Sequence, residues 1–259
     1  MWVKAKAKLS SMIIFQNVGL QLGGVQILEN LDLSVQKGEL VCLLGPSGCG
    51  KSTILRLIGD LLACTSGSIQ VAGGLPNAAW NKIAYVFQSP RLLPWKNALE
   101  NASFGLEMRY PDLSAKERLS IASEQLTKVG LSNDMQKMPI MLSGGEKQRV
   151  AIARALALKP EIILMDEPFS ALDPNTRRLL RLQLIDLWKE AGNTIIFVTH
   201  DIDEALELGD RILVLGTKPA YVRNIINPDS CRPREIDTND KLRKIKVSLI
   251  QEFRDISET

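Results

Sequence analysis

The fold of this chain is most clearly indicated by one stretch, Gly45-Pro46-Ser47-Gly48-Cys49-Gly50-Lys51-Ser52. Its closely spaced glycines let the backbone turn tightly and aim several N–H groups at one point. The turn follows an apolar run, Glu39–Leu44, and opens an apolar helical pattern, Lys51–Leu62. A strand, a glycine-rich turn and a helix in this order form a phosphate cradle, because the helix N-terminus adds the positive end of its dipole. We therefore predict a polyphosphate site at this turn.

A pair of acidic residues follows another apolar strand. The run Glu161–Met165 ends in Asp166-Glu167-Pro168. Two carboxylates at a strand end are often only solvated loop residues, but the glycine-rich turn upstream favours a functional interpretation. We expect Asp166 to hold Mg²⁺ through water and Glu167 to polarise an attacking water, because phosphoryl transfer depends on positioning and charge compensation. A well-placed general base adds roughly 10²–10⁴-fold to a rate.

His200 is the only histidine of the chain, and it ends the strand-like run Thr194–Thr199. A single histidine is usually structural, but open α/β sheets bind their ligands at the carboxyl ends of strands. A neutral imidazole there could donate a hydrogen bond to a γ-phosphate and sense its loss. With no second histidine or paired thiols nearby, we do not expect it to bind a metal.

Apolar runs alternate with helical patterns along the chain. Strands are predicted at Glu39–Leu44, Lys82–Phe87, Glu161–Met165, Thr194–Val198 and Arg211–Leu215. Helical sequence follows two of them directly, at Lys51–Leu62 and Asp201–Leu208. This alternation is typical of a mainly parallel sheet covered by helices, which is an α/β fold.

Three other segments have patterns of their own. Met12–Leu20 and Val25–Val35 are strand-like runs separated by two glycines, and they predict an antiparallel edge element. Between about Ser89 and Leu158 the strands stop, and helical patterns with Pro and Gly breaks predict an inserted helical subdomain. From Asp240 onward, apolar residues recur at steps of three and four, which predicts a terminal helix docked on the core.

Composition narrows the class of protein. The chain has 259 residues and a formal net charge of +3, which is too small to indicate nucleic acid as the main partner. No uninterrupted apolar run exceeds five residues, whereas a membrane span needs about 20. Cys42, Cys49, Cys64 and Cys231 show no zinc spacing and are expected to be reduced thiols. The basic stretch Met1–Lys8 is either a solvated tail or a contact with an anionic membrane surface.

Over roughly residues 12–235, these features resemble the nucleotide-binding subunit of an ATP-binding-cassette (ABC) transporter. Gly45–Ser52 resemble Walker A, Ile162–Asp166 resemble Walker B, and Gln88 is similar to the glutamine of the Q-loop. The resemblance makes Glu167 the catalytic glutamate and His200 the switch histidine, and it identifies Ser170-Ala171-Leu172-Asp173 with the D-loop.

The resemblance also implies how the chain is organised. We expect a P-loop NTPase (RecA-like) core at 1–88 and 159–239, a helical subdomain at 89–158 and a C-terminal helix at 240–259, all in one ABC ATPase domain. The expected cofactors are ATP and Mg²⁺. The expected catalytic residues are Glu167, His200, Lys51 and Gln88. Magnesium would be held by Ser52, Gln88 and Asp166. ATP would contact Gly45, Pro46, Ser47, Gly48, Cys49, Gly50, Lys51, Ser52 and Thr53.

The segment Leu142-Ser143-Gly144-Gly145-Glu146 resembles the ABC signature, and it is the most specific of these matches. In the family it covers the ATP held by a second cassette, with Ser143 and Gly145 contacting the γ-phosphate. A glycine turn that opens a helix, here Glu146–Leu158, is itself an anion site. One chain cannot fold this turn onto its own distant cradle, so we expect two ATP molecules sandwiched between two cassettes, identical or different.

One position departs from the family pattern. The loop before Gly23 and Gly24 usually carries an aromatic residue that stacks on adenine, and Leu22 stands at that position. Stacking on an aromatic side chain contributes about 1–3 kcal/mol per base in single-strand binding proteins. We therefore hypothesise weaker affinity for the base, or a relaxed preference for ATP over GTP.

The sequence also points to a subgroup. Leu92-Leu93-Pro94-Trp95 and the later Cys231-Arg232-Pro233-Arg234 resemble importers of the nitrate, sulfonate, taurine and bicarbonate group. Trp95 either anchors the helical subdomain or lines the groove that receives a helix of the membrane subunit. The solute itself is not specified, because the ATPase does not touch it.

We therefore expect an ATPase subunit of a bacterial importer, bound to the cytoplasmic face of the plasma membrane. Its partners would be a second ATPase subunit, permease subunits and, indirectly, an external solute-binding protein. Two alternatives stay open at this point. The first is a soluble ABC ATPase acting on nucleic acid or ribosomes, although tandem cassettes, long coiled-coil insertions and zinc modules are absent. The second is a regulatory cassette that binds ATP without hydrolysing it, against which the intact Asp166, Glu167 and His200 argue.

Overall fold

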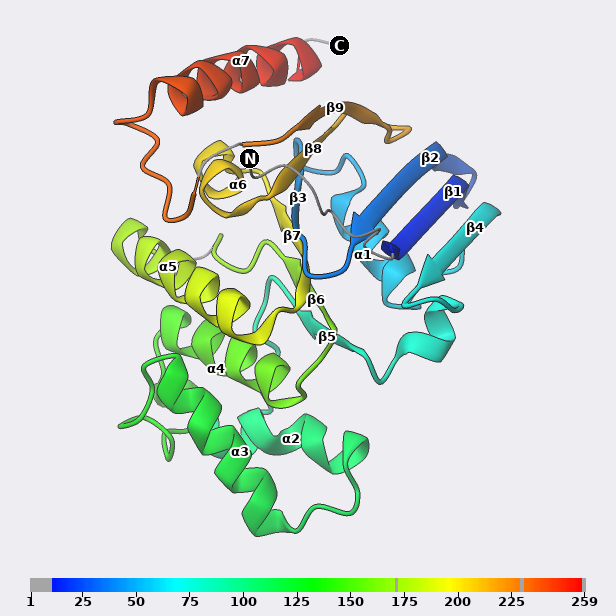
Figure 1. The fold of residues 1–259 in the computed structure, drawn as a ribbon. Helices are drawn as coiled ribbons and strands as arrows, with labels where there is room; N and C mark the ends of the chain where they lie inside the picture. The colour runs from blue at the N-terminus through cyan, green and yellow to red at the C-terminus, as the bar shows by residue number, and fades with distance from the viewer. Residues whose placement is uncertain (1–10, 171, 229–230, 258–259) are drawn as a thin grey trace, which may run out of the picture.

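The computed structural model describes residues 11–170, 172–228 and 231–257, and its centre is a six-stranded sheet (Figure 1). The predicted tail Met1–Lys8 and the D-loop residue Ala171 lie outside the described residues. All neighbouring strands in the sheet are parallel except β8 and β9. Their order is β5 (Ile83–Val86), β6 (Ile162–Asp166), β7 (Thr194–Thr199), β3 (Leu40–Leu44), β8 (Arg211–Leu215) and β9 (Val222–Ile226).

The five predicted strands of the core sheet are confirmed. The central strands are apolar runs buried on both faces. Every residue of β3 and β6 is buried. Leu40, Cys42 and Leu44 pack on one face of the sheet, while Val41 and Leu43 pack on the other. Because β3, β6 and β7 run parallel, their carboxyl ends reach the same edge of the sheet.

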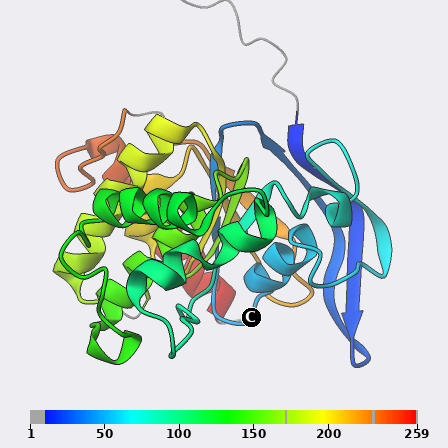
Figure 2. The same ribbon diagram turned by 90° about the horizontal axis from the view of Figure 1, so that it is seen from below.

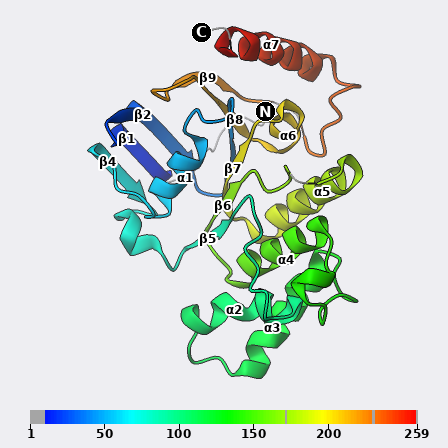
Figure 3. The same cartoon turned by 180° about the vertical axis from the view of Figure 1, so that it is seen from behind.

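One face of this sheet is covered by a second sheet and a helix (Figures 1 and 3). The second sheet is antiparallel, with the order β2 (Val25–Gln36), β1 (Ser11–Leu22) and β4 (Ser66–Val71). The predicted N-terminal antiparallel element is thus present, but it pairs with β4 in a sheet of its own instead of extending the edge of the core sheet. The short 3₁₀ helix η1 (Pro76–Ala79) follows β4.

The helix after the glycine-rich turn, α1 (Lys51–Ile58), is shorter than predicted. The expected end at Leu62 was wrong because Asp60 adopts a left-handed backbone, with φ 56°. Leu61 N–H then donates to the carbonyl of Arg56, and Asp60 N–H donates to that of Leu57. These bonds close the helix in a Schellman motif. Leu61 and Leu62 continue the apolar pattern without continuing the helix.

The opposite face of the core sheet is covered by helices (Figure 1). These are α4 (Gly144–Ala157), α5 (Pro174–Ala191) and α6 (Ile202–Leu208). The helices α2 (Ala98–Arg109) and α3 (Ala115–Lys128) pack against α4 and each other, farther from the sheet, and are in front in the view from below (Figure 2). The short 3₁₀ helix η2 (Pro139–Met141) precedes α4.

The C-terminal helix α7 (Asp240–Ser257) packs on α6 (Figure 1). Leu242, Leu249 and Ile256 are buried in the helical side of the core, as the spacing of apolar residues predicted. Among the described residues, no helix combines the length and the apolar character that a bilayer span requires.

Candidate functional site

The glycine-rich turn connects β3 to α1 at the carboxyl edge of the core sheet. Gly48 and Gly50 have φ of 78° and 111°, a region that residues with side chains rarely adopt. At Gly45 the limitation is space, because a Cβ atom would lie 2.9 Å from the sulfur of Cys49 and 3.1 Å from the carbonyl oxygen of Leu215. The turn therefore requires glycine for conformation at two positions and for close packing at a third.

Lys51 is the first residue of α1, and its side chain is buried inside this turn. The ammonium donates hydrogen bonds to the carbonyl oxygens of Gly45 and Pro46, both at 2.8 Å. Its Nζ lies 4.0 Å from a carboxylate oxygen of Glu167. A buried positive charge needs such partners, and together they hold it at the mouth of the predicted cradle.

Ser52 and Asp166 place two oxygen ligands side by side. The Ser52 hydroxyl donates to Asp166 Oδ1 at 2.8 Å. Asp166 is buried, and burial is the main reason why its pKa is raised above its ordinary value. Hydroxyl and carboxylate oxygens suit Mg²⁺, which usually takes one or two protein ligands together with phosphates and water. The residues present therefore fit the expected metal, and the described residues contain no cluster of three or more His, Cys, Asp or Glu side chains that would suggest another.

Glu167 and His200 meet because they follow the neighbouring parallel strands β6 and β7. Glu167 has a left-handed backbone with φ 42°, and its N–H donates to the carbonyl of Val198. Its Oε2 lies 3.0 Å from Nδ1 of His200. The Gln88 amide reaches the same oxygen at 3.5 Å. A non-glycine residue with positive φ is often found at functional sites, where the surrounding structure fixes it.

The fold thus gathers six of the predicted site residues from four segments: Lys51, Ser52, Gln88, Asp166, Glu167 and His200. Thr53, also a predicted ATP contact, follows Ser52 in α1.

The predicted signature lies elsewhere, at the start of α4. Ser143 caps this helix by accepting a hydrogen bond from the N–H of Glu146, whose carboxylate accepts one from the N–H of Ser143. A Cβ atom on Gly145 would lie 3.0 Å from Thr176 in α5, so glycine permits close packing there. The contacts of Leu142–Glu146 recorded among the described residues include none with Lys51, Ser52 or Asp166. Among the described contacts, the signature and the cradle of one chain are therefore separate.

Comparison with known proteins settles the family. A profile of the family described as "ABC transporter" matches residues 28–170, a span that includes the cradle, the signature and Asp166. The chain belongs to the ABC transporter family. It is an ATPase cassette of that family, which agrees with the assembled Lys51, Asp166 and Glu167.

Several curated relatives of the cassette are import proteins. The chain is 42% identical over 216 residues to the bicarbonate transport ATP-binding protein CmpD of Synechocystis, a match that covers 83% of this chain and 77% of the relative. It is 43% identical to the nitrate import ATP-binding protein NrtD of Synechococcus elongatus, covering 80% and 76%. It is 41% identical to the taurine import ATP-binding protein TauB of Escherichia coli K12, covering 82% of each chain.

Solved structures resemble the cassette as well. The ATP-binding cassette MJ0796, solved as a dimer in a post-hydrolysis state with ADP and Pi, matches with a TM-score of 0.76 and 36% identity. This match covers 85% of the present chain and 100% of that chain. A second dimeric structure of MJ0796 matches equally well.

The cassette also has a site residue that the sequence analysis missed. The Tyr85 hydroxyl lies 3.5 Å from Asp166 Oδ2, and the Tyr85 ring stacks on Phe87 with centroids 4.1 Å apart. Arg91 lies over the other ring, 4.0 Å from the centroid of Phe87. The spacing of Tyr85 in β5 and Phe87 directly after it indicates that both rings lie on one face, but nothing in the sequence indicated the contact of Tyr85 with Asp166.

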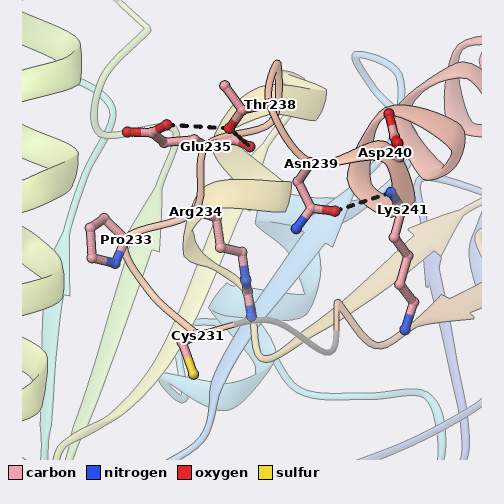
Figure 4. A pocket seen from close by; sticks show the side chains of 8 residues that line it. All are labelled: Cys231, Pro233, Arg234, Glu235, Thr238, Asn239, Asp240 and Lys241. Atoms are coloured by element: carbon pink, nitrogen blue, oxygen red, sulfur yellow. Dashed lines mark hydrogen bonds between the residues drawn. The ribbon is translucent and has the colours of Figure 1, made fainter.

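An open cavity of about 540 Å³ is lined by residues between Cys231 and Lys241, which lead into α7 (Figure 4). None of these residues belongs to the predicted cradle. The polar groups of the cavity bond to one another and to backbone. The Arg234 guanidinium donates to the carbonyls of Leu206, Gly209 and Pro228, and Thr238 donates to Glu235. Arg234 therefore holds this segment against the end of α6.

Proposed function

We propose that this chain is the ATP-hydrolysing subunit of an importer that takes up a small solute, such as nitrate, sulfonate, taurine or bicarbonate, through a membrane permease. The observation that carries the proposal is the pairing of Glu167 with His200, beside the buried Lys51 and the Ser52–Asp166 pair. The import functions named for the bicarbonate, nitrate and taurine relatives support the choice of solute class.

The cradle binds ATP through its own backbone and Lys51. The N–H groups of the loop that ends at Gly50 face the β- and γ-phosphates, and the α1 dipole favours their negative charge. The phosphates compete with the carbonyls of Gly45 and Pro46 for the Lys51 ammonium. Ser143 and Gly145 of a second cassette complete the site, consistent with the dimeric state of the solved relative.

Ser52 and Asp166 are the residues that would hold Mg²⁺, together with Gln88, whose amide reaches the neighbouring Glu167 at 3.5 Å. When bound, Mg²⁺ neutralises negative charge on the phosphates and orients them. Glu167 accepts a hydrogen bond from the attacking water and orients it, and the His200 imidazole fixes the Glu167 carboxylate at 3.0 Å. The water oxygen bonds to the γ-phosphorus while the bond from that phosphorus to the β,γ-bridging oxygen breaks, and the water's proton passes to Glu167. ADP and inorganic phosphate leave, which resets the dimer.

A groove at the helical subdomain suits the permease. A cavity of about 270 Å³ is lined by Tyr85, Phe87, Arg91, Phe104 and Arg154, among others. Trp95 is 70% exposed, which favours a role at a contact surface over a role as an anchor inside the subdomain. We propose that a helix of the permease occupies this groove, and that the cassette therefore works as a peripheral subunit on the cytoplasmic face of the membrane, with an external solute-binding protein as an indirect partner.

The catalytic assignment is tested by Glu167→Gln in the assembled transporter. We expect ATP turnover to fall about 10²–10⁴-fold, with ATP binding retained. Glu161→Gln is the matched control, because Glu161 precedes the other end of β6 and its exposed carboxylate pairs only with Lys82 among the described contacts. Equal turnover in wild type and Glu167→Gln would overturn the assignment and favour a regulatory cassette.

The importer assignment needs a separate experiment. The permease is identified as the membrane protein that co-purifies with the cassette. The two are expressed together, and uptake of labelled bicarbonate, nitrate and taurine is measured in cells that carry wild type or Glu167→Gln. Uptake of one of these solutes that depends on Glu167 supports the proposal. Absence of membrane association when the permease is co-expressed, with binding to ribosomes or nucleic acid instead, would support the non-transport alternative, which no structural feature described above favours.

A further inference from the structure

Arg177, in the first turn of α5, contacts both loops that carry the predicted catalytic pair. One loop runs from Glu167 at the end of β6 to Asp173, where α5 begins. The other contains His200 and Asp201, between β7 and α6. The two loops leave the same edge of the sheet, and their only side-chain link at the reacting end is the 3.0 Å contact of Glu167 with His200 among the described residues.

The Arg177 guanidinium forms hydrogen bonds with both of these loops. It donates to the carbonyl oxygen of Leu172 at 3.2 Å, in the Glu167 loop. It also donates to Asp201 Oδ2 at 3.3 Å, in the residue directly after His200. Its Nε lies 3.7 Å from Glu204, a buried carboxylate in α6. One side chain therefore sets the spacing of the two loops.

The segment around His200 is held by hydrogen bonds of the residues on either side, Thr199 and Asp201. The His200 side chain itself is 53% exposed. Asp201 caps α6 by accepting hydrogen bonds from the N–H groups of Asp203 and Glu204. The Thr199 hydroxyl donates to Glu204 at 2.6 Å and accepts from the N–H of Asp201. The position of His200 therefore depends on Thr199 and Asp201, and Arg177 in turn holds Asp201.

From this geometry we propose that Arg177 is a positioning residue, which holds the Glu167 and His200 loops in the register that hydrolysis requires. The inference rests on the proposed function, because it acts through that pair. Arginine suits the role since its planar fork donates in several directions at once, whereas lysine offers a single ammonium. Misplacement of reacting groups by about 1 Å can cost roughly 10²-fold in rate.

Arg181 provides a matched control within the same cluster. It lies one turn further along α5, is more buried than Arg177, and pairs with Glu204 at 3.9 Å and with Glu207 at 2.8 Å. Among its described contacts there is none with Leu172 or Asp201. Removing Arg181 therefore perturbs the charge cluster between α5 and α6 without releasing either loop.

The test uses the cassette assembled with its permease, and compares Arg177→Met with Arg181→Met. We expect Arg177→Met to lower kcat about 10- to 100-fold, with affinity for a fluorescent ATP analogue unchanged. Arg181→Met should lower the unfolding temperature at least as much while kcat stays within about twofold. Equal loss of kcat in both variants would show that Arg177 only stabilises the fold, and would overturn the proposal.

A double-mutant cycle with His200→Ala isolates the mechanism. The proposed role of Arg177 is to keep His200 in register with Glu167, so Arg177→Met should cause no further loss of kcat once His200 is removed in the His200→Ala background, whereas independent effects would multiply. Multiplication refutes the proposal. Should Arg177→Met fail to fold, Arg177→Lys replaces it, with an intermediate loss expected in wild type and none in the His200→Ala background. A normal kcat for His200→Ala alone would refute the catalytic role of His200, and the comparison with Arg181→Met would still judge Arg177.

Discussion

Replacing Ser143 by alanine separates the structural role of the signature from its predicted role in a composite site. The Ser143 hydroxyl caps α4 by accepting from the N–H of Glu146 at 3.2 Å. Loss of such a cap costs about 1 kcal/mol. With an unfolding entropy of about 2.1 cal/mol/K per residue, this lowers the unfolding temperature of the 259-residue chain by about 2 °C. Stability alone therefore predicts a small effect.

The composite-site prediction adds a much larger effect. If the same hydroxyl also contacts ATP held by a second cassette, Ser143→Ala removes a hydrogen bond to a charged group, which contributes about 1.5–3 kcal/mol. Such a loss corresponds to about 10- to 150-fold in the rate of ATP hydrolysis. The measurement is steady-state ATPase activity of the assembled transporter, with thermal unfolding of the isolated cassette followed in parallel.

The chain offers a close control in Ser114, which opens α3 with the same chemistry. Ser114 accepts from the N–H of Glu117, and the Glu117 carboxylate accepts from the N–H of Ser114, in a second capping box. We expect Ser114→Ala to lower the unfolding temperature by a similar amount and to leave ATPase activity unchanged. If Ser143→Ala reduces activity no more than Ser114→Ala does, the signature does not complete a nucleotide site and the reasoning fails.

Three further predictions follow from single residues. Leu22 is 42% exposed at the end of β1, so Leu22→Tyr should tighten ATP binding by up to about 1–3 kcal/mol if it stacks on adenine; ATP and GTP affinities that Leu22→Tyr leaves unchanged from wild type would remove the hypothesis. Burial raises the pKa of Asp166, so the folded state binds its proton more tightly than the unfolded state, and stability falls as pH rises from the ordinary aspartate range through the raised pKa. Asp166→Asn should therefore unfold at an equal or higher temperature than wild type at pH 8 without nucleotide, while ATPase activity is lost; a clear drop in unfolding temperature would contradict this sign. Leu164 is fully buried in β6 and packs near Gly59 of the α1 end, so Leu164→Ala should cost about 2.7–5 kcal/mol in denaturant unfolding, and a cost below 1 kcal/mol would show that the site collapses.

The core of the fold could be predicted because strands buried on both faces are continuous apolar runs in the sequence. Continuous apolar runs such as Leu40–Leu44 have few other interpretations when glycine follows them. The strands β4 and β9 have no such apolar run, since most of their residues are exposed or half-buried. The helix α5 was not predicted either, because exposed leucines, Leu179 and Leu182, stand among its buried positions and blur the pattern of a single apolar face.

Local chemistry could be predicted more fully than distances. The order of motifs predicted that Lys51, Asp166 and Glu167 act together, and the parallel sheet brings them within contact. Nothing in the linear sequence places Tyr85 beside Asp166, or Arg177 between two loops, because both contacts depend on strand order and helix packing. Arg178, next in the chain, has the same side chain but is exposed, so the sequence alone cannot choose between neighbouring arginines.

The left-handed backbone of Glu167 has a consequence for engineering this protein. A side chain in that conformation costs of order 1–3 kcal/mol, whereas glycine adopts it freely. Selection for heat resistance alone would therefore favour glycine at this position. The selected variants would unfold at a higher temperature but would not hydrolyse ATP. Any stabilisation campaign has to measure turnover as well as unfolding temperature, because a residue that strains the backbone is also the one that the reaction is expected to require.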